Sequence, residues 1–349
     1  MRNHRPFRAG SVSLLIDKRA LAVTLSLFIF FLIVLIVSTG VGDLFIAPLD
    51  VLKSLFGAGS DMHNLVVRMF RLPRILLAAF AGMALAVAGA ILQGIVRNPL
   101  ASPDIIGITG GASLATVSFL ALFSTADNAL TVSIHWLPLA SFLGALGTGV
   151  LVYGLSQKQG TSAMRLVLIG IGIAAGMQAL TQFIMLLGPI YVASRATIWL
   201  TGSVHGASWD QVATLAVWFA AMFALTMVMA RRLNVQELGP SVAISVGSSV
   251  NRDRNGLLIL CTALAGGAVA FAGGIGFVGL MAPHMARRLV GAPYGGLIPV
   301  SALLGGLLVM LADLIGRTLF LPLEVPAGVF TSAIGAPYFI YLLYKSRNR

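Results

Sequence analysis

Few residues of this 349-residue chain have types and spacings that could support chemistry. A phosphate-binding loop of the Walker A type needs a lysine directly after a glycine, and no lysine of the chain follows a glycine. The histidines are scattered without a ligand pair at helical spacing, so no metal site is predicted. His284 and Asp313 could belong to an intramembrane hydrolase, but no nucleophile motif accompanies them. The single cysteine, Cys261, excludes an intrachain disulfide.

Arginines at the ends of long apolar segments are the more informative feature. The motif Arg71-Leu-Pro-Arg74 opens one such segment, and Arg317 closes another. If these arginines form a basic rim on a membrane protein, they would attract an acidic protein surface or an anionic solute. The structural alternative is that their side chains extend to lipid headgroups.

The elements that must position these arginines are membrane helices. Hydrophobic residues make up 58% of the chain and charged residues only 10%, whereas a soluble domain has about 25% charged residues. A membrane crossing needs about 20 apolar residues. The sequence therefore predicts an all-α fold, a polytopic helical bundle of about ten transmembrane helices. They cover residues 20–38, 75–96, 105–123, 136–156, 166–188, 211–230, 257–273, 275–290, 297–315 and 328–344, of which the third and eighth are short.

The distribution of charge gives this bundle an orientation. The net charge of +12 is spread over loops between apolar segments and not over a soluble face, which argues against nucleic-acid binding. With ten spans and a cytoplasmic N-terminus, most of the 23 basic residues lie inside, as membrane proteins prefer. Both termini are then cytoplasmic. Arg71, Arg74 and Arg317 lie outside, against this bias. Their position favours a functional role for them.

Two segments of the chain resemble each other. Residues 81–91 and 265–275 share a pattern of glycine, alanine and isoleucine, and Pro99 and Pro283 keep the same spacing. Because the copies lie five spans apart, they would have opposite orientations, as in the inverted repeats of transporters. Chance matching of small residues is the alternative. We predict one permease domain, 1–349, with halves of roughly 1–205 and 206–349. Gly172-x-x-x-Gly176 also predicts close helix packing.

The positions of the acidic residues bear on the source of energy. Ion-coupled carriers usually place ionisable residues in mid-bilayer. Here Asp104, Asp313 and Glu324 lie near span ends, and no span centre is charged. An ion-coupled secondary transporter is therefore disfavoured, although it stays the main alternative. A transporter without its own energy source needs a partner that supplies one.

The longest cytoplasmic loop, residues 231–255, is a candidate docking site for such a partner. Leu238, Val242 and Val246 recur at helical spacing, which fits a short amphipathic helix that ends at Gly247. A solvated connector is the alternative interpretation of this loop.

Several motifs together resemble the permeases of iron–siderophore, heme and cobalamin ABC importers. They extend from about Leu65 to the C-terminus and are closest to the ferric citrate and catecholate-siderophore permeases. In chain order they are Arg71-Leu-Pro-Arg74, Gly89-x-x-x-Gln93-Gly94, Arg97-Asn-Pro-Leu-Ala-Ser-Pro-Asp104, Phe277-x-Gly279-Leu-x-Ala-Pro-His284, Ala312-Asp313-x-x-x-Arg317, Pro326-x-Gly328-Val329 and Gly335-Ala336-Pro337.

The resemblance implies a transport subunit and not an enzyme. Its partners would be a second permease (a homologue or a copy), two cytoplasmic ATP-binding-cassette ATPases and an extracytoplasmic solute-binding protein. The binding protein would deliver a ferric siderophore for passage across a bacterial plasma membrane, and heme or cobalamin is the alternative cargo. No cofactor would be bound by this chain, because ATP and Mg are used by the partner ATPase.

The resemblance also assigns roles to individual residues. Arg71, Arg74 and Arg317 would contact acidic residues of the binding protein. Thr161 and Ser162 would narrow the pathway as a cytoplasmic gate. The family usually has acidic residues after the first glycine of its ATPase-coupling segment, where this chain has Pro240-Ser241. The coupling segment would comprise Glu237, Leu238, Gly239, Pro240, Ser241, Ala243 and Gly247.

Overall fold

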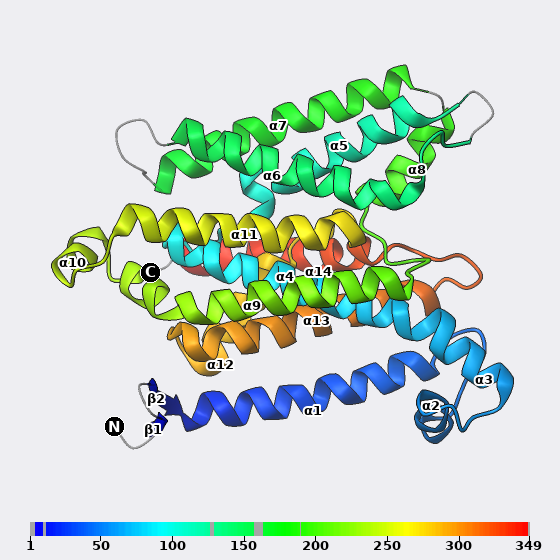
Figure 1. Cartoon of the computed structure of the whole chain (residues 1–349), viewed down its shortest axis with the longest axis horizontal. Coiled ribbons are helices and arrows are strands. Elements are labelled where there is room, and N and C mark those ends of the chain that lie inside the picture. Colours follow the sequence, from blue (N-terminus) through cyan, green and yellow to red (C-terminus); the bar gives the residue numbers. More distant parts are fainter. Residues whose placement is uncertain (1–3, 10–11, 126–128, 157–162, 189, 348–349) are drawn as a thin grey trace.

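The computed structural model describes residues 4–9, 12–125, 129–156, 163–188 and 190–347 as a bundle of long helices (Figure 1). The longer helices are α1 (Lys18–Gly40), α4 (Leu72–Val96), α5 (Ile108–Phe123), α6 (Leu137–Ser156), α7 (Ala163–Leu187), α9 (Trp209–Glu237), α11 (Val250–Ala272), α12 (Val278–Val290), α13 (Tyr294–Thr318) and α14 (Ala327–Arg347). The shorter elements are β1 (His4–Ala9), β2 (Val12–Asp17), α2 (Pro48–Leu55), α3 (Asp61–Leu65), η1 (Val66–Arg71), η2 (Pro103–Ile106), η3 (Ile134–Trp136), α8 (Ile190–Leu200) and α10 (Pro240–Ser245).

The helices confirm the predicted membrane fold. Eight helices of the described chain are long and apolar enough to cross a membrane. The third and eighth predicted segments are helices too, but α5 and α12 have only 16 and 13 residues. The described chain begins and ends at the same end of the bundle (Figure 1), as an even number of crossings requires. A small antiparallel hairpin, β1 with β2, precedes α1 and is an addition to the predicted all-α fold.

Helix α4 forms the centre of the bundle. Nearly every side chain from Ile75 to Val96 is buried, and the helix packs against α9, α11, α12 and α13. Small residues make this possible, since a Cβ at Gly82 would overlap the backbone of Gly305, and one at Gly89 would overlap the backbone of Gly279. Glycine at such crossings lets helix backbones come close together.

The other predicted glycine pair behaves differently. Gly172 and Gly176 lie on α7, and a Cβ at either would meet nothing within 4 Å in the described chain. No helix of the described chain uses this pair for close packing, so the predicted close approach stays a prediction for a partner chain. In Figure 1, α5, α6, α7 and α8 form a group along one edge of the bundle, and α1 runs along the opposite edge against α13.

The two similar segments agree in direction but differ in backbone. Helices α4 and α11 run in opposite directions (Figure 1), as an inverted repeat requires. However, α4 stays helical to Val96, whereas α11 ends at Ala272. There the backbone turns at Gly273, with φ 69°, and leads into α12. The positive φ favours glycine, and the equivalence of the two copies does not extend beyond this point.

Candidate functional site

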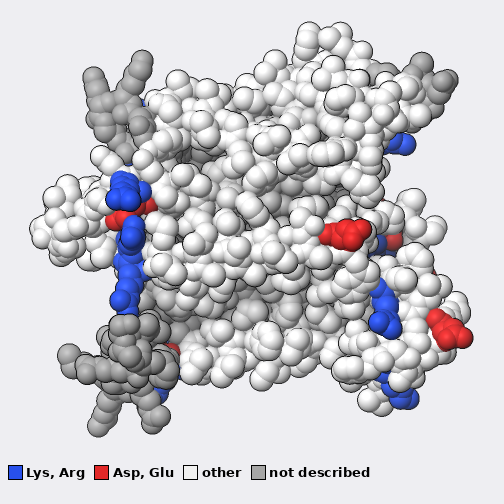
Figure 2. Space-filling model, viewed as in Figure 1, with Lys and Arg blue, Asp and Glu red and all other residues white. Residues whose placement is uncertain are grey.

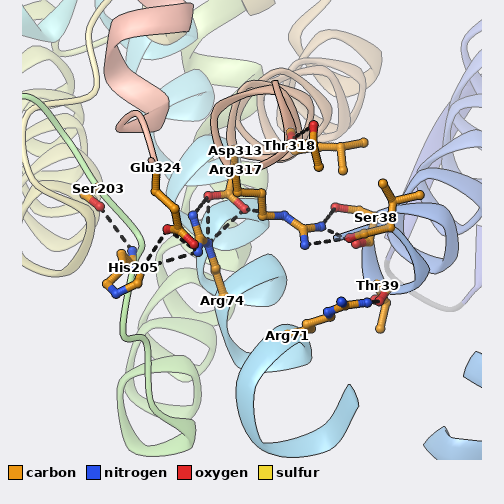
Figure 3. A network of polar contacts seen from close by, with 12 residues as sticks. Ser38, Thr39, Arg71, Arg74, Ser203, His205, Asp313, Arg317, Thr318 and Glu324 are labelled. Carbon is orange, nitrogen blue, oxygen red and sulfur yellow. Dashed lines mark hydrogen bonds and ion pairs between the residues drawn. The ribbon is translucent and has the colours of Figure 1, made fainter. Parts of the chain in front are cut away.

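The three predicted docking arginines lie together at the end of the bundle opposite α10 (Figure 3). Arg71 ends η1, just before α4, and its Nη1 atom donates to the carbonyl oxygens of Thr39 (2.9 Å) and Gly40 (3.0 Å). Its Nη2 atom donates to the carbonyl of Leu44 at 2.6 Å. The last carbonyls of a helix have no partner within it and carry partial negative charge. Arg71 therefore caps the end of α1 without needing a carboxylate.

Arg317 binds the same end of α1, next to Arg71 (Figure 3). It lies in the last turn of α13 and donates to the carbonyl of Val41 at 2.8 Å and to the carbonyl of Ser38. Its Nε atom also lies 3.5 Å from Oδ2 of Asp313, one helical turn earlier. The side chain of Arg317 is buried, so it joins α1 to α13 and is turned away from solvent.

Arg74 makes the strongest carboxylate contacts of the three. Its Nε atom donates to Oδ1 of Asp313 at 2.9 Å, and its Nη2 atom lies 2.9 Å from the same oxygen. Asp313 is only 3% exposed at its side chain. A buried carboxylate is tolerated when it is paired and hydrogen-bonded. Here the guanidinium groups of Arg74 and Arg317 form ion pairs with Asp313, and Arg74 also donates hydrogen bonds to it. These contacts link α4 to α13.

A second, more exposed carboxylate completes this network. Oε2 of Glu324, in the loop between α13 and α14, lies 2.8 Å from Nη1 of Arg74 and 2.8 Å from Nδ1 of His205. The Glu324 side chain is 38% exposed. Partial burial would raise the pKa of Glu324, but the hydrogen bonds and charge of Arg74 and His205 outweigh burial and lower it below the ordinary value.

The structure thus brings Arg71, Arg74 and Arg317 together, but it does not present them as a freely exposed basic rim. Each guanidinium is engaged by carbonyls or carboxylates of the same chain. Sequence reasoning missed the roles of Glu324 and His205, because no local spacing connects them to Arg74. The contact of Asp313 with Arg317 could have been found, since the two residues are four apart on a helix.

The predicted coupling segment forms a short exposed helix at the other end of the bundle. Gly239 and Gly247, with φ of 103° and 81°, turn the chain into and out of α10. Pro240 occupies the first turn, where its missing N–H costs nothing. Ala243 is buried, whereas the large apolar side chains of the segment are exposed. They belong to Leu238, Val242, Ile244 and Val246.

One detail of this segment differs from the prediction. Leu238 caps α9 and is not part of α10, whose last helical residue is Ser245 and which is terminated by the left-handed Gly247, as predicted. Glu237 forms an ion pair with Arg287 at 2.7 Å, and its part in ATPase coupling stays a prediction. Arg287 also contacts the hydroxyl of Tyr294 at 2.7 Å. Glu237 therefore ties the end of α9 to α12 and α13, while Ser241 is exposed on α10.

The remaining predicted positions contribute less. Thr161 and Ser162 lie outside the described residues, so their role as a gate stays a prediction. Within the described part of the chain, no group of three or more His, Cys, Asp or Glu residues could hold a metal ion. His284 packs its ring against Tyr338 at 5.9 Å between ring centroids, while Asp313 is engaged by arginines. The two do not form a catalytic pair.

Residues 29–345, nearly the whole chain, match the FecCD transport family. The chain belongs to the FecCD transport family. This FecCD chain is 56% identical over 332 residues to the Probable siderophore transport system permease protein YfhA of Bacillus subtilis, covering 95% of this chain and 97% of that protein. It is 46% identical over 317 residues to the Achromobactin transport system permease protein CbrC of Dickeya dadantii, covering 91% and 89% of the two chains.

The fold of the FecCD chain agrees with a solved structure as well. A metal-chelate type ABC transporter in an inward-facing conformation superposes with a TM-score of 0.82 and 30% identity, covering 93% of this chain and 99% of that one. The FecCD chain is therefore a multi-pass membrane permease of the ABC importer class, and it is a transport subunit and not an enzyme. A permease of this class works with ATPase and binding-protein partners.

Proposed function

We propose that this chain is the membrane permease of an importer that carries a ferric siderophore from a binding protein into the cytoplasm. The observation that carries the proposal is the 56% identity, over 95% of the chain, to a siderophore permease. The energy would come from ATP hydrolysis in partner chains, which would also use the Mg, and alternating access would move the cargo. This chain contributes the pathway and binds no nucleotide or cofactor of its own in this scheme.

The α10 end of the bundle faces the cytoplasm in this proposal. Basic side chains gather near this end, over the left ends of α9 and α11 (Figure 2). Such enrichment is the usual property of the cytoplasmic side. Both ends of the described chain lie at the same end as α10 (Figure 1). The arginine cluster then faces outward, where a solute-binding protein of a bacterial plasma membrane would approach.

Two ATPase subunits would dock on the permease pair through α10 of each copy. The exposed side chains of Leu238, Val242, Ile244 and Val246 support this contact, because contiguous exposed apolar residues outside the lipid indicate a protein interface. Ala243 is buried and anchors α10 to the bundle. Movement imposed on α10 would reach α12 and α13 through the ion pair of Glu237 with Arg287.

The binding protein would dock at the arginine cluster by carboxylate exchange. Arg71 and Arg317 donate their hydrogen bonds to carbonyls at the end of α1. Arg74 is therefore the arginine whose carboxylate partner could be exchanged for one of the binding protein. Glu324 is that partner, and it is the more exposed carboxylate of the network. An acidic residue of the binding protein that displaces Glu324 from Arg74 would keep the guanidinium paired throughout docking.

The second permease would pack beside α7. Gly172 and Gly176 lie on a face of α7 that has no close neighbour in the described chain, and Ile171 and Leu180 on this helix are exposed. Small residues spaced by four let another helix approach closely in a membrane. Whether the partner is a copy or a homologue follows from co-purification of differently tagged chains.

A reconstitution experiment tests the importer assignment. Proteoliposomes that contain the permease, its ATPase and the binding protein are expected to take up ferric siderophore only with ATP. Permease reconstituted alone is expected to remain inactive under a proton or sodium gradient. Uptake that is driven by an ion gradient in the absence of the ATPase would show that the protein is a secondary transporter.

A further inference from the structure

A basic pocket lies beside α10, between the last turns of α9 and the first turn of α11. Its volume is about 450 Å³. The lining contains three guanidinium groups, those of Arg231, Arg232 and Arg252, and one carboxylate, that of Asp253. The pocket is not part of the arginine cluster, which lies at the opposite end of the bundle.

The single carboxylate of the pocket is already satisfied. Oδ1 of Asp253 lies 2.6 Å from Nη1 of Arg232, and its Oδ2 accepts a hydrogen bond from the hydroxyl of Ser248 at 2.8 Å. The lining therefore has two more positive charges than negative ones. The Arg252 side chain is exposed, and no ion pair of it is seen among the described residues. Guanidinium groups in such a position match the geometry of phosphate oxygens.

Exposed apolar residues continue from the pocket towards the middle of the bundle. Val228 precedes Arg231 and Arg232 by three and four residues on α9, so it shares their face. It is 77% exposed. Ile259 follows Arg252 by two turns on α11 and is 67% exposed. At a rise of about 1.5 Å per residue, both lie within roughly 10 Å of the arginines along the helix axes.

This arrangement matches the shape of a phospholipid. We propose that the pocket binds the phosphate headgroup of one anionic phospholipid, whose acyl chains lie over Val228 and Ile259. Basic pockets between transmembrane helices at the cytoplasmic surface recognise anionic lipids. Figure 2 looks at the bundle from the side, and the basic group over α9 and α11 lies on this side face. Val246 and Gly247 of the coupling segment also line the pocket, so the ATPase is the competing occupant that the test must exclude.

Native mass spectrometry of the purified full-length permease tests the proposal. Phosphatidylglycerol and phosphatidylcholine are added to separate samples, and the wild type is expected to retain one phosphatidylglycerol preferentially. Combined Arg231→Gln and Arg252→Gln substitutions should weaken this retention about 30-fold, which corresponds to about 1 kcal/mol for each basic residue near an anionic lipid. The control is Arg288→Gln, because Arg288 is exposed at the same end on α12 but does not line the pocket. This control should retain lipid as the wild type does.

Three results would overturn the inference. Equal lipid retention by the pocket variant and the control would remove the site. Thermal stabilisation of the wild type by inorganic phosphate as strongly as by phosphatidylglycerol would assign the pocket to a free anion. Unchanged lipid retention with loss of ATPase co-purification would assign it to the ATPase. If the double variant does not fold, Arg252→Gln alone and Val228→Gln replace it, and each should lower lipid retention.

Discussion

The buried carboxylate of the arginine cluster offers the sharpest test of the structure. Asn in place of Asp313 keeps the shape of the side chain but removes its charge. Arg74 would then keep only Glu324 as a carboxylate partner, and Arg317 would keep no carboxylate partner within the network. Both guanidinium groups are largely buried, so water cannot replace the lost contact. We therefore expect Asp313→Asn to destabilise the contact between α4 and α13.

The exposure of the two carboxylates sets the expected magnitude. Removal of one partner from a buried ion pair costs about 3–5 kcal/mol, and Asp313 is 3% exposed. An exposed ion pair contributes about 0.2–1 kcal/mol, and Glu324 is 38% exposed. Asp313→Asn should therefore lower the free energy of unfolding by about 3 kcal/mol more than the matched control Glu324→Gln. Such a loss is a large fraction of the stability of an ordinary protein, about 5–15 kcal/mol.

Unfolding by SDS in mixed micelles measures these free energies. The experiment compares the wild type, Asp313→Asn, Glu324→Gln and Arg74→Gln, together with the double variant of Arg74 and Asp313. Because Arg74 and Asp313 are in direct contact, the double variant should lose less stability than the sum of the two single variants. A difference of less than about 1 kcal/mol between Asp313→Asn and Glu324→Gln would refute the structural role of the buried pair.

Three further predictions follow from other parts of the structure. Gly89→Val should cost at least about 1–3 kcal/mol of unfolding free energy in the same assay, because a side chain there overlaps the backbone of Gly279, whereas Gly172→Val should leave the stability of the single chain unchanged. The lowered pKa of Glu324 stabilises the native state fully above the ordinary carboxyl pKa, and this contribution disappears as the pH falls through the lowered value. Wild type and Glu324→Gln should therefore differ in melting temperature at about pH 7 and converge as the pH falls progressively below the ordinary carboxyl pKa of about 4.3, and a constant difference would contradict this. Ile244→Asp should reduce co-purification of the ATPase at least tenfold, while Leu323→Asp, in an exposed loop at the opposite end, should not; equal effects would remove α10 from the interface.

The transmembrane helices were predictable because hydrophobic length alone defines them. All ten predicted segments are helices, and even the two short ones, α5 and α12, were recognised as such. The packing role of each glycine was less predictable, because glycine occurs both at tight helix crossings and on open helix faces. Gly82 and Gly89 admit neighbouring backbones, whereas Gly172 has nothing near it. The sequence shows at which glycines another helix backbone could come close. Only the packed bundle shows at which of them a neighbouring helix does.

The residues of the candidate site were predictable in identity and not in environment. Charge bias and motif resemblance both selected Arg71, Arg74 and Arg317, and the structure places them in one cluster. Their inward orientation depends on the carbonyls that end α1 and on Glu324, which local spacing in the sequence does not link to them. The same limit applies to Glu237, whose partner Arg287 lies on a different helix.

The inward pairing of the arginines bears on how a binding protein could dock. A partly buried guanidinium without a counter-charge is unfavourable, so a site of three unpaired arginines would be unstable whenever the binding protein is absent. Glu324 solves this problem for Arg74, because its carboxylate pairs with the guanidinium from an exposed loop. Exchange of this carboxylate for one of the binding protein leaves the number of ion pairs unchanged. The affinity then depends on the difference between two similar contacts, which suits a partner that must dock and leave in every transport cycle.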